Sequence, residues 1–184
     1  MSDVDSAAWQ PNLQFLSPLG IESAHKIQWP NIAQLQMLNL TQQIKLSAVE
    51  IAVSSNLYEL RLSFTGDIKS EKICTNQTYA KDSSALRTFK IDPKRRIAAM
   101  CLNLNEVQGN IFGMQILDDE GEFLMNEQWF TPAEGVVTAW KRVDIPEGKE
   151  IIGVHATHDG DYITNLGLIV WSPNPDAKKI MNAD

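Results

Sequence analysis

The sequence predicts an all-β domain in which one hairpin pattern is used three times. Residues 145–171 carry the pattern most clearly, since two apolar segments there flank a polar turn. Related apolar segments begin at Leu57, Ile111 and Ile163, which are separated by 54 and then 52 residues. A near-constant separation of this size indicates that one supersecondary unit is repeated along the chain.

The last hairpin is predicted from the alternation of its side chains. Residues 151–154 and 163–171 are apolar, and the Asp159-Gly160 pair between them supplies the positive φ angles that a tight reversal requires. Alternate residues of the second arm point to opposite faces of a sheet. The two sets are Leu166, Leu168 and Val170, and Gly167, Ile169 and Trp171. Both sets are largely apolar, so this strand is expected to be covered on both sides.

The first two hairpins share these features. In both 91–97 and 145–151, an apolar residue precedes a turn with proline, then charged residues and a second apolar residue six positions on. Segments 57–62, 111–116 and 163–168 also correspond. A single hairpin cannot bury its own apolar face, so the three are expected to pack together. The result would be a three-sided β structure with pseudo-threefold symmetry.

The chain outside the repeats is less regular. The predicted divisions are an N-terminal arm at 1–43, the β domain at 44–172 and a C-terminal tail at 173–184. The arm is predicted to be partly irregular, with a short strand at 27–29 that Pro30 ends and a helical spacing of apolar residues at 32–40. A long polar loop is predicted at 67–88, which is either functional or a tolerated surface segment.

Length and composition indicate one globular domain. The chain has 184 residues, of which 43% are hydrophobic and 21% charged, enough for one core and too few for two. A net charge of −7 disfavours nucleic acid and anionic lipid as partners. The N-terminus lacks the basic and apolar blocks of a signal peptide, and no apolar segment is long enough to span a bilayer. An intracellular, cytoplasmic location without membrane insertion is therefore expected.

No arrangement in the sequence points to catalysis, so we expect neither catalytic residues nor a cofactor. The Gly-x-Ser-x-Gly motif and the glycine-rich phosphate loops are absent from the sequence. Asp118 and three neighbouring acidic residues flank Gly121, which predicts a water-exposed turn rather than two carboxylates with divided pKa values. Cys101 alternates with apolar residues and is expected to be a buried free thiol.

Three residues of the last hairpin are of types that bind metal ions. His155, His158 and Asp161 lie close together in the sequence, whereas His25 matches no pattern. His-x-x-His alone does not specify a metal centre, and no residue can be named that would orient the two rings. We therefore expect no metal site, and an enzyme built on this loop ranks below the functions considered next.

Two tryptophans are candidates for an interface. Aromatic side chains anchor protein interfaces and stack on sugar rings. Trp9 lies in the arm, and Trp129 lies between two predicted strands. The alternatives are that the arm around Trp9 is only strapped across the surface and that Trp129 fills the core. Trp171 ends a core strand and is expected to be structural.

Residues 148–155 and 166–170 resemble the last part of a jacalin-like lectin domain. That family has a short turn with glycine, an Ile-Ile-Gly-Val-His type of strand, and a final strand that contains glycine, as here. The resemblance covers about residues 44–171 and leaves the N-terminal arm unexplained. It implies a β-prism of three four-stranded antiparallel sheets, in agreement with the threefold pattern.

The resemblance also implies a sugar site in the last hairpin. The family uses a Gly-x-x-x-Asp element, in which backbone amides beside the glycine and the aspartate side chain contact sugar hydroxyls. The matching ligand-binding residues here are Gly160, Asp161, Tyr162 and Thr164. Thr164 replaces the aspartate, and a charged acceptor makes hydrogen bonds roughly twice as strong as a neutral one. Sugar binding at this loop is therefore expected to be weakened.

These observations lead to two hypotheses for function. The first is a non-catalytic, intracellular interaction or structural module of jacalin-like fold that docks within a larger protein assembly. It rests on the altered sugar element and on the lack of catalytic motifs. The alternative is a carbohydrate-binding lectin that uses the loop at 160–164 to bind a glycan. A glycan array and recovery of the native complex distinguish the two.

Overall fold

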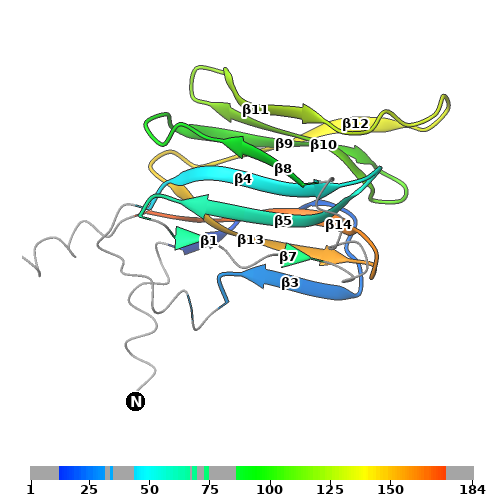
Figure 1. Cartoon of the computed structure of the whole chain (residues 1–184), viewed down its shortest axis with the longest axis horizontal. Coiled ribbons are helices and arrows are strands. Elements are labelled where there is room, and N and C mark those ends of the chain that lie inside the picture. The colour runs from blue at the N-terminus through cyan, green and yellow to red at the C-terminus, as the bar shows by residue number, and fades with distance from the viewer. Residues whose placement is uncertain are drawn as a thin grey trace, which may run out of the picture.

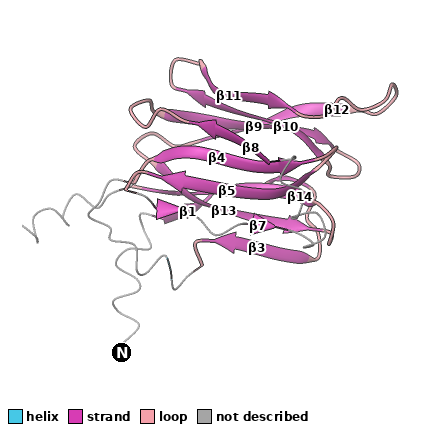
Figure 2. Ribbon diagram, in the orientation of Figure 1, coloured by secondary structure: helices cyan, strands magenta, loops and turns pink. Residues whose placement is uncertain are grey.

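The computed structural model shows a molecule built from β-strands (Figures 1 and 2). It describes residues 13–31, 34, 44–66, 68–69, 73–74 and 86–172. Three antiparallel sheets surround one hydrophobic core, and their strands run along the long axis of the molecule. The predicted all-β fold of three sheets is confirmed. In this part of the chain, no helix has the length and apolarity needed to cross a bilayer.

Sheet B contains the first hairpin. Its strands are β4 (Leu46–Val53), β5 (Leu57–Phe64), β6 (Ile68–Lys69), β7 (Ile73–Cys74) and β8 (Leu86–Lys90). The main path runs β6-β5-β4-β8, and β7 also pairs with β5. The polar loop predicted at 67–88 therefore contributes short strands at both of its ends, because backbone groups can pair along a sheet edge without an apolar pattern.

Sheet C contains the second hairpin and is continuous in the sequence. Its strands are β9 (Ile97–Asn105), β10 (Ile111–Asp118), β11 (Phe123–Gln128) and β12 (Thr138–Asp144). They are ordered β11-β10-β9-β12, so the hairpin of β9 and β10 lies in the centre and the next two strands flank it.

Sheet A joins the two ends of the chain. Its strands are β1 (Leu13–Phe15), β2 (Leu19–Gly20), β3 (His25–Trp29), β13 (Glu150–His158) and β14 (Ile163–Trp171). β1 and β2 pair with β14, and β3 pairs with β13. The segment 13–29, predicted to lie in an arm outside the β domain, is therefore part of the prism. The helical spacing predicted at 32–40 falls almost entirely outside the described residues.

The three hairpins occupy equivalent places around the core. Leu57, Ile111 and Ile163 each begin the second strand of a central hairpin, and all three are 0% exposed. Each hairpin ladder also contains two register shifts, one toward each end. Such bulges increase strand twist, which lets a sheet curve around a shared core. The spacing seen in the sequence thus reports a real threefold repeat.

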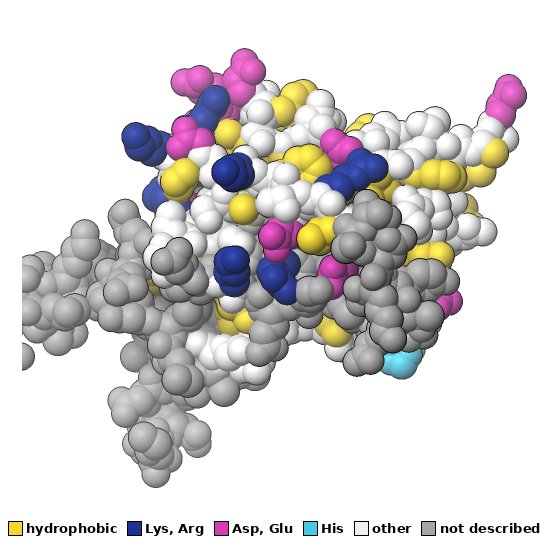
Figure 3. All heavy atoms as spheres, in the orientation of Figure 1, with side chains coloured by type: hydrophobic (Ala, Val, Ile, Leu, Met, Phe, Trp, Pro, Cys, Tyr) yellow, Lys and Arg dark blue, Asp and Glu magenta, His cyan; other side chains and the backbone are white. Residues whose placement is uncertain are grey.

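All three hairpin tips lie at one end of the molecule, called here the hairpin end. The turns at 54–56, 106–110 and 159–162 meet there, and the 129–137 connection between β11 and β12 extends beyond them (Figure 1). Lys and Arg side chains gather mainly toward the opposite end on the face that Figure 3 shows. Loops from all three sheets come together at the hairpin end, and loops held by a rigid scaffold commonly carry binding residues.

Candidate functional site

The tip of the last hairpin uses its backbone amides internally. Gly160 has a φ of 107°, and its N–H donates to Nδ1 of His158 at 3.1 Å. Oδ1 of Asp159 accepts the N–H groups of Asp161 at 2.9 Å and of Tyr162 at 2.8 Å. These are the amides beside the glycine that the jacalin resemblance assigns to a sugar. A ligand would have to displace bonds that the turn already makes.

Thr164 is covered by the N-terminal segment. It is 2% exposed, and its Oγ1 lies 2.6 Å from Oγ of Ser23. Its carbonyl oxygen accepts the N–H of Ile21 at 3.0 Å, and an ideal Cβ on Gly20 would lie 2.3 Å from the same oxygen. Of the predicted sugar-binding residues, Asp161 is exposed, Gly160 and Tyr162 are partly exposed, and Thr164 is buried beneath residues 20–23.

The histidines of this region make separate contacts. Nε2 of His155 lies 2.8 Å from the carbonyl oxygen of Leu16, and its ring packs on Gly167. His158 instead stacks on His25, its cross-strand partner, with ring centroids 4.9 Å apart. Among the described residues, no three His, Cys, Asp or Glu side chains are grouped to hold a metal ion. The sequence does not predict the stacking of His158 on His25, because this contact forms only when β3 joins sheet A.

Of the two predicted interface tryptophans, the structure describes only Trp129, and this residue is buried. Trp129 is 9% exposed and belongs to the core, and its indole N–H donates to the carbonyl oxygen of Ile111 at 3.1 Å. Of the two alternatives for Trp129, the structure shows core filling, because its backbone N–H continues the pairing of β11 with β10 by donating to the Phe112 carbonyl. Trp9 lies outside the described residues.

Asp118 and Cys101 are both buried in sheet C. Asp118 is buried rather than water-exposed: its carboxylate accepts the N–H groups of Glu120 and Glu122 at 3.0 and 2.8 Å and pairs with Arg95. It therefore closes the turn after β10. Cys101 is a buried free thiol, as predicted, and its pKa is raised chiefly by burial.

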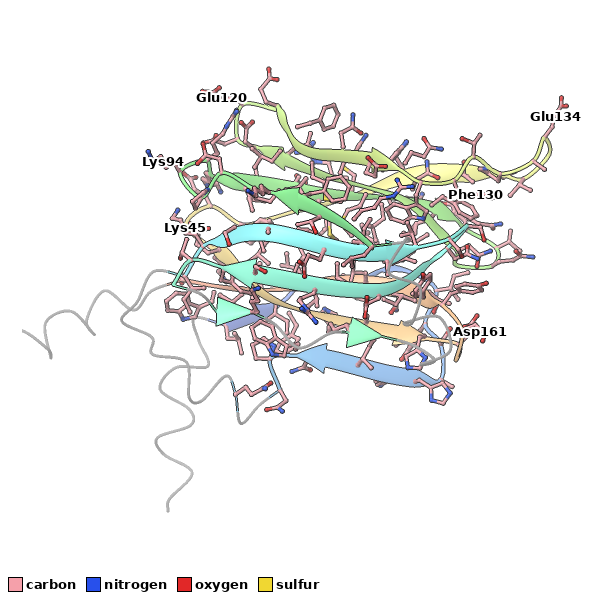
Figure 4. All side chains as sticks on the ribbon, viewed as in Figure 1. Lys45, Lys94, Glu120, Phe130, Glu134 and Asp161 are labelled. Carbon is pink, nitrogen blue, oxygen red and sulfur yellow. The ribbon has the colours of Figure 1, made fainter. Side chains whose placement is uncertain are left out.

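A groove lined by carboxamides opens at the hairpin end, and we call it the amide groove. Its volume is about 290 Å³, and it lies between the tips of sheets B and C and the 129–137 connection. Phe130, labelled in Figure 4, lies at this end of the molecule. The residues that give the groove its chemistry are Asn56, Asn105, Gln108, Asn110, Phe112 and Phe130. None of the described residues that line it is ionisable.

The turn of β9 and β10 holds its amides in place. Oδ1 of Asn105 accepts the N–H groups of Val107 at 2.9 Å and of Gln108 at 3.1 Å. Gly109, with a φ of 76°, closes the turn through an N–H bond to the Asn105 carbonyl at 2.8 Å. Nδ2 of Asn110 reaches Oε1 of Gln108 at 3.3 Å. The groove is therefore bordered by polar groups that are oriented before a ligand arrives.

Aromatic rings form the other wall. Phe112 and Phe130 have ring centroids 5.3 Å apart, and Phe130 is 37% exposed whereas Phe112 is buried. The backbone N–H of Trp129 donates to the Phe112 carbonyl at 3.0 Å, so Phe130 follows directly on an anchored core residue. An exposed ring held by a buried neighbour presents a firm apolar surface to a ligand.

Asn56, which lines the groove, carries a buried polar atom without a partner among the described residues. The residue is 8% exposed, its Nδ2 lies 3.4 Å from Oγ of Ser55, and its Oδ1 has no hydrogen-bond partner within the described structure. A buried carboxamide oxygen without a partner costs about 1–3 kcal/mol. Such a cost is expected at a site where a ligand donor, or a water molecule that a ligand replaces, completes the bonding.

The groove exists at sheet C because the connection there is long. Nine residues, 129–137, join β11 to β12, whereas four residues, 21–24, join β2 to β3 at the equivalent place in sheet A. The short connection closes over Thr164, and the long one extends outward and leaves space. No local sequence motif predicts this site, because its residues come from three separate segments: 55–56, 105–112 and 130–136.

A larger groove of about 440 Å³ lies over β13 and β14, between β2 and β3. Its polar side chains are engaged within the chain. His155 is bonded to Leu16, and Oδ1 of Asn165 accepts the N–H and the hydroxyl of Thr157 at 2.8 and 2.7 Å. Unlike the amide groove, this groove is also lined by ionisable residues, Glu22 and Lys26.

Comparison with known proteins identifies the fold. No protein-family model and no curated protein sequence matches the chain. The structure of artocarpin in complex with mannotriose aligns with a TM-score of 0.56 at 11% identity over 86% of this chain and 97% of that one. Calystegia sepium agglutinin aligns with a TM-score of 0.59 at 13% identity over 88% and 98%. The fold is the jacalin-like β-prism.

A lamprey immune protein shares this β-prism. Its structure aligns with a TM-score of 0.61 at 13% identity, over 88% of this chain and 45% of that chain. The identities are too low to carry a site or a ligand from one protein to another. They confirm the predicted fold, including the threefold arrangement, and leave the function to be argued from the residues.

Proposed function

We propose that this protein binds neutral carbohydrate in the amide groove. The observation that carries the proposal is the combination of fixed, uncharged amides with the exposed ring of Phe130 in one groove. Sugar hydroxyls both donate and accept hydrogen bonds, and carboxamides do the same. The apolar face of a sugar ring stacks on an aromatic side chain. A groove without ionisable lining favours a neutral ligand over a charged one.

The structural neighbours support carbohydrate as the class of ligand. Artocarpin is described in complexes with mannotriose and with methyl-α-mannose, and a second neighbour is described as a mannose-binding lectin from champedak. The lectin alternative thus has more support than the interaction module, although at a different place on the prism from the loop at 160–164.

Binding measurements with matched variants test the proposal. A glycan array selects the saccharide, and calorimetry then measures its affinity for the wild type, Phe130→Ala, Asn56→Ala and Asp161→Ala. We expect each of the first two changes to weaken binding by about tenfold, equivalent to about 1.4 kcal/mol. Asp161→Ala, at the tip of the last hairpin, is the control and should bind like the wild type. Circular dichroism establishes that each variant is folded.

Two outcomes contradict the proposal. If Asp161→Ala abolishes binding and Phe130→Ala leaves it unchanged, the sugar site is the last hairpin. If the wild type binds no saccharide on the array or at millimolar concentration, the protein is not a lectin. Docking within an intracellular assembly, the first hypothesis from the sequence, then becomes the leading candidate, to be tested by recovery of the native complex.

A further inference from the structure

The outer face of sheet C carries an exposed tryptophan that lies along the sheet. Trp140 on β12 is paired with Asn103 on β9, and Asn103 is paired with Gly113 on β10. Trp140 and Gly113 are thus two strands apart, about 10 Å. An ideal Cβ on Gly113 would nevertheless lie 2.8 Å from Cη2 of Trp140. The indole must therefore extend across β9 along the surface of the sheet, and the side chain is 38% exposed.

Two features beneath this ring are unfavourable for stability. Glycine weakens the interior of a strand, yet a Cβ at Gly113 would meet both the indole of Trp140 at 2.8 Å and the backbone carbonyl oxygen of Glu127 at 2.9 Å. Asn103 is 5% exposed, and its Oδ1 has no hydrogen-bond partner within the described structure. The ring lies outside the core clusters and covers the sheet with one face only, since Trp140 is 38% exposed. An arrangement that costs stability without filling the core is expected to serve a contact.

Polar side chains surround the ring on the same face. Gln115 on β10 donates through Nε2 to Oδ1 of Asn126 on β11 at 3.0 Å, and Gln128 is paired directly with Gly113. Arg142 follows Trp140 at the next outward position of β12. Arg142 is paired with Asp144, so the ring is bordered by amides on one side and by an ion pair on the other. Like the amide groove, it combines an apolar stacking surface with hydrogen-bonding groups.

This surface continues from the amide groove. Asn103 and Asn105 are alternate residues of β9, so they face the same side of the sheet at a separation of about 7 Å. Asn105 lines the groove, and Val136 of the groove wall is four residues before Trp140. A chain of sugar residues that leaves the groove along β9 therefore meets the indole next.

We propose that Trp140 is a second saccharide contact, and that the ligand is an oligosaccharide or polysaccharide chain that runs from the amide groove onto the indole. This inference rests on the proposed function of the groove. It assigns the groove to one sugar residue and Trp140 to a later residue of the same chain. Affinity should therefore rise with the length of the saccharide.

Calorimetry with saccharides of increasing length tests the inference. The ligands are the monosaccharide selected by the array and its linear oligomers. For the wild type we expect at least a tenfold gain in affinity from monomer to oligomer. Trp140→Ala should remove this gain and leave monosaccharide affinity unchanged, and Trp140→Tyr should keep most of it. Phe123→Ala is the matched control, because Phe123 is an aromatic residue 51% exposed at the other end of sheet C.

The possible failures are distinguishable. Equal affinity of the wild type for monomer and oligomer, or an equal loss of both in Trp140→Ala, overturns the role of Trp140 while the groove remains a sugar site. No saccharide binding by the wild type overturns the proposed function itself. If Trp140→Ala changes the oligomeric state in light scattering and leaves all saccharide affinities unchanged, Trp140 is a protein contact and the inference is wrong.

Discussion

His158 lies where strand β13 enters the last turn, and its ring holds two elements together. It stacks on His25 of β3, and its Nδ1 accepts the N–H of Gly160, which requires that nitrogen to be unprotonated. Burial first, and the charge of His25 second, lower the pKa of His158 below its usual 6.5, while Asp159 acts in the opposite direction. The native state therefore binds this proton more weakly than the unfolded chain does.

This pKa shift predicts a loss of stability in mild acid. The contribution of neutral His158 is fully present above the unfolded pKa of about 6.5 and is lost as the pH falls through the lowered native pKa. His158→Asn keeps an acceptor for Gly160 but does not titrate. Urea unfolding between about pH 7.5 and 5 should therefore show a smaller loss of stability in His158→Asn than in the wild type. Identical pH profiles would contradict the assignment.

At the scale of elements, sheet A differs from the other two in how it is completed. In sheet C, the flanking strands β11 and β12 follow the hairpin directly in the sequence. In sheet A, the hairpin ends at Trp171 and the flanking strands come from 13–29. Close backbone approach marks the junction: an ideal Cβ on Gly153 would lie 2.3 Å from the carbonyl oxygen of Trp29 and 2.4 Å from Cδ of Pro30.

Gly153→Ala is predicted to loosen β3 selectively. The added methyl group meets backbone and proline-ring atoms, which cannot move to another rotamer. We therefore expect the free energy of unfolding to fall by about 1–3 kcal/mol. Amide hydrogen exchange should accelerate in His25–Trp29, the strand that the methyl group displaces. The amides of β9 and β10 in sheet C serve as the internal control and should exchange at their former rates under native conditions. Uniform acceleration across all three sheets would contradict this local account.

The whole molecule is three hairpins that share one core. The main cluster of buried residues takes members from all three sheets, and Leu57, Ile111 and Ile163 occupy equivalent, fully buried positions in it. Because no sheet has a separate core on its inner face, we expect the prism to unfold as a unit.

Equivalent truncations should therefore have similar effects. Leu57→Ala, Ile111→Ala and Ile163→Ala are each expected to cost about 2–5 kcal/mol, from lost burial and the cavity left behind. Near-ultraviolet circular dichroism and tryptophan fluorescence should report coincident urea transitions in all three variants. A variant in which one signal is lost well before the other would show that its sheet unfolds separately.

Much of the fold is readable from the sequence because hairpin alternation is local. The strand from Ile163 to Trp171 is long and apolar on both faces, and the structure has it with the bounds that its sequence pattern predicts. The strands of sheet A at 13–20 have two or three residues each, too few to show alternation. The prediction of a water-exposed Asp118 is wrong for a related reason: its neighbours in sequence are acidic and exposed, and its partner Arg95 comes from another turn.

The all-β, threefold fold is already present in the sequence, because the spacing of apolar residues dictates which strands need a common core. The candidate site, in contrast, follows from the folded chain. The tertiary structure buries Thr164 beneath residues 20–23, and it brings Asn56, Asn105 and Phe130 to one groove. Whether a hairpin tip is covered or borders a groove depends on the length of the connection that passes over it. That depends on the folded chain, and no local sequence pattern predicts it.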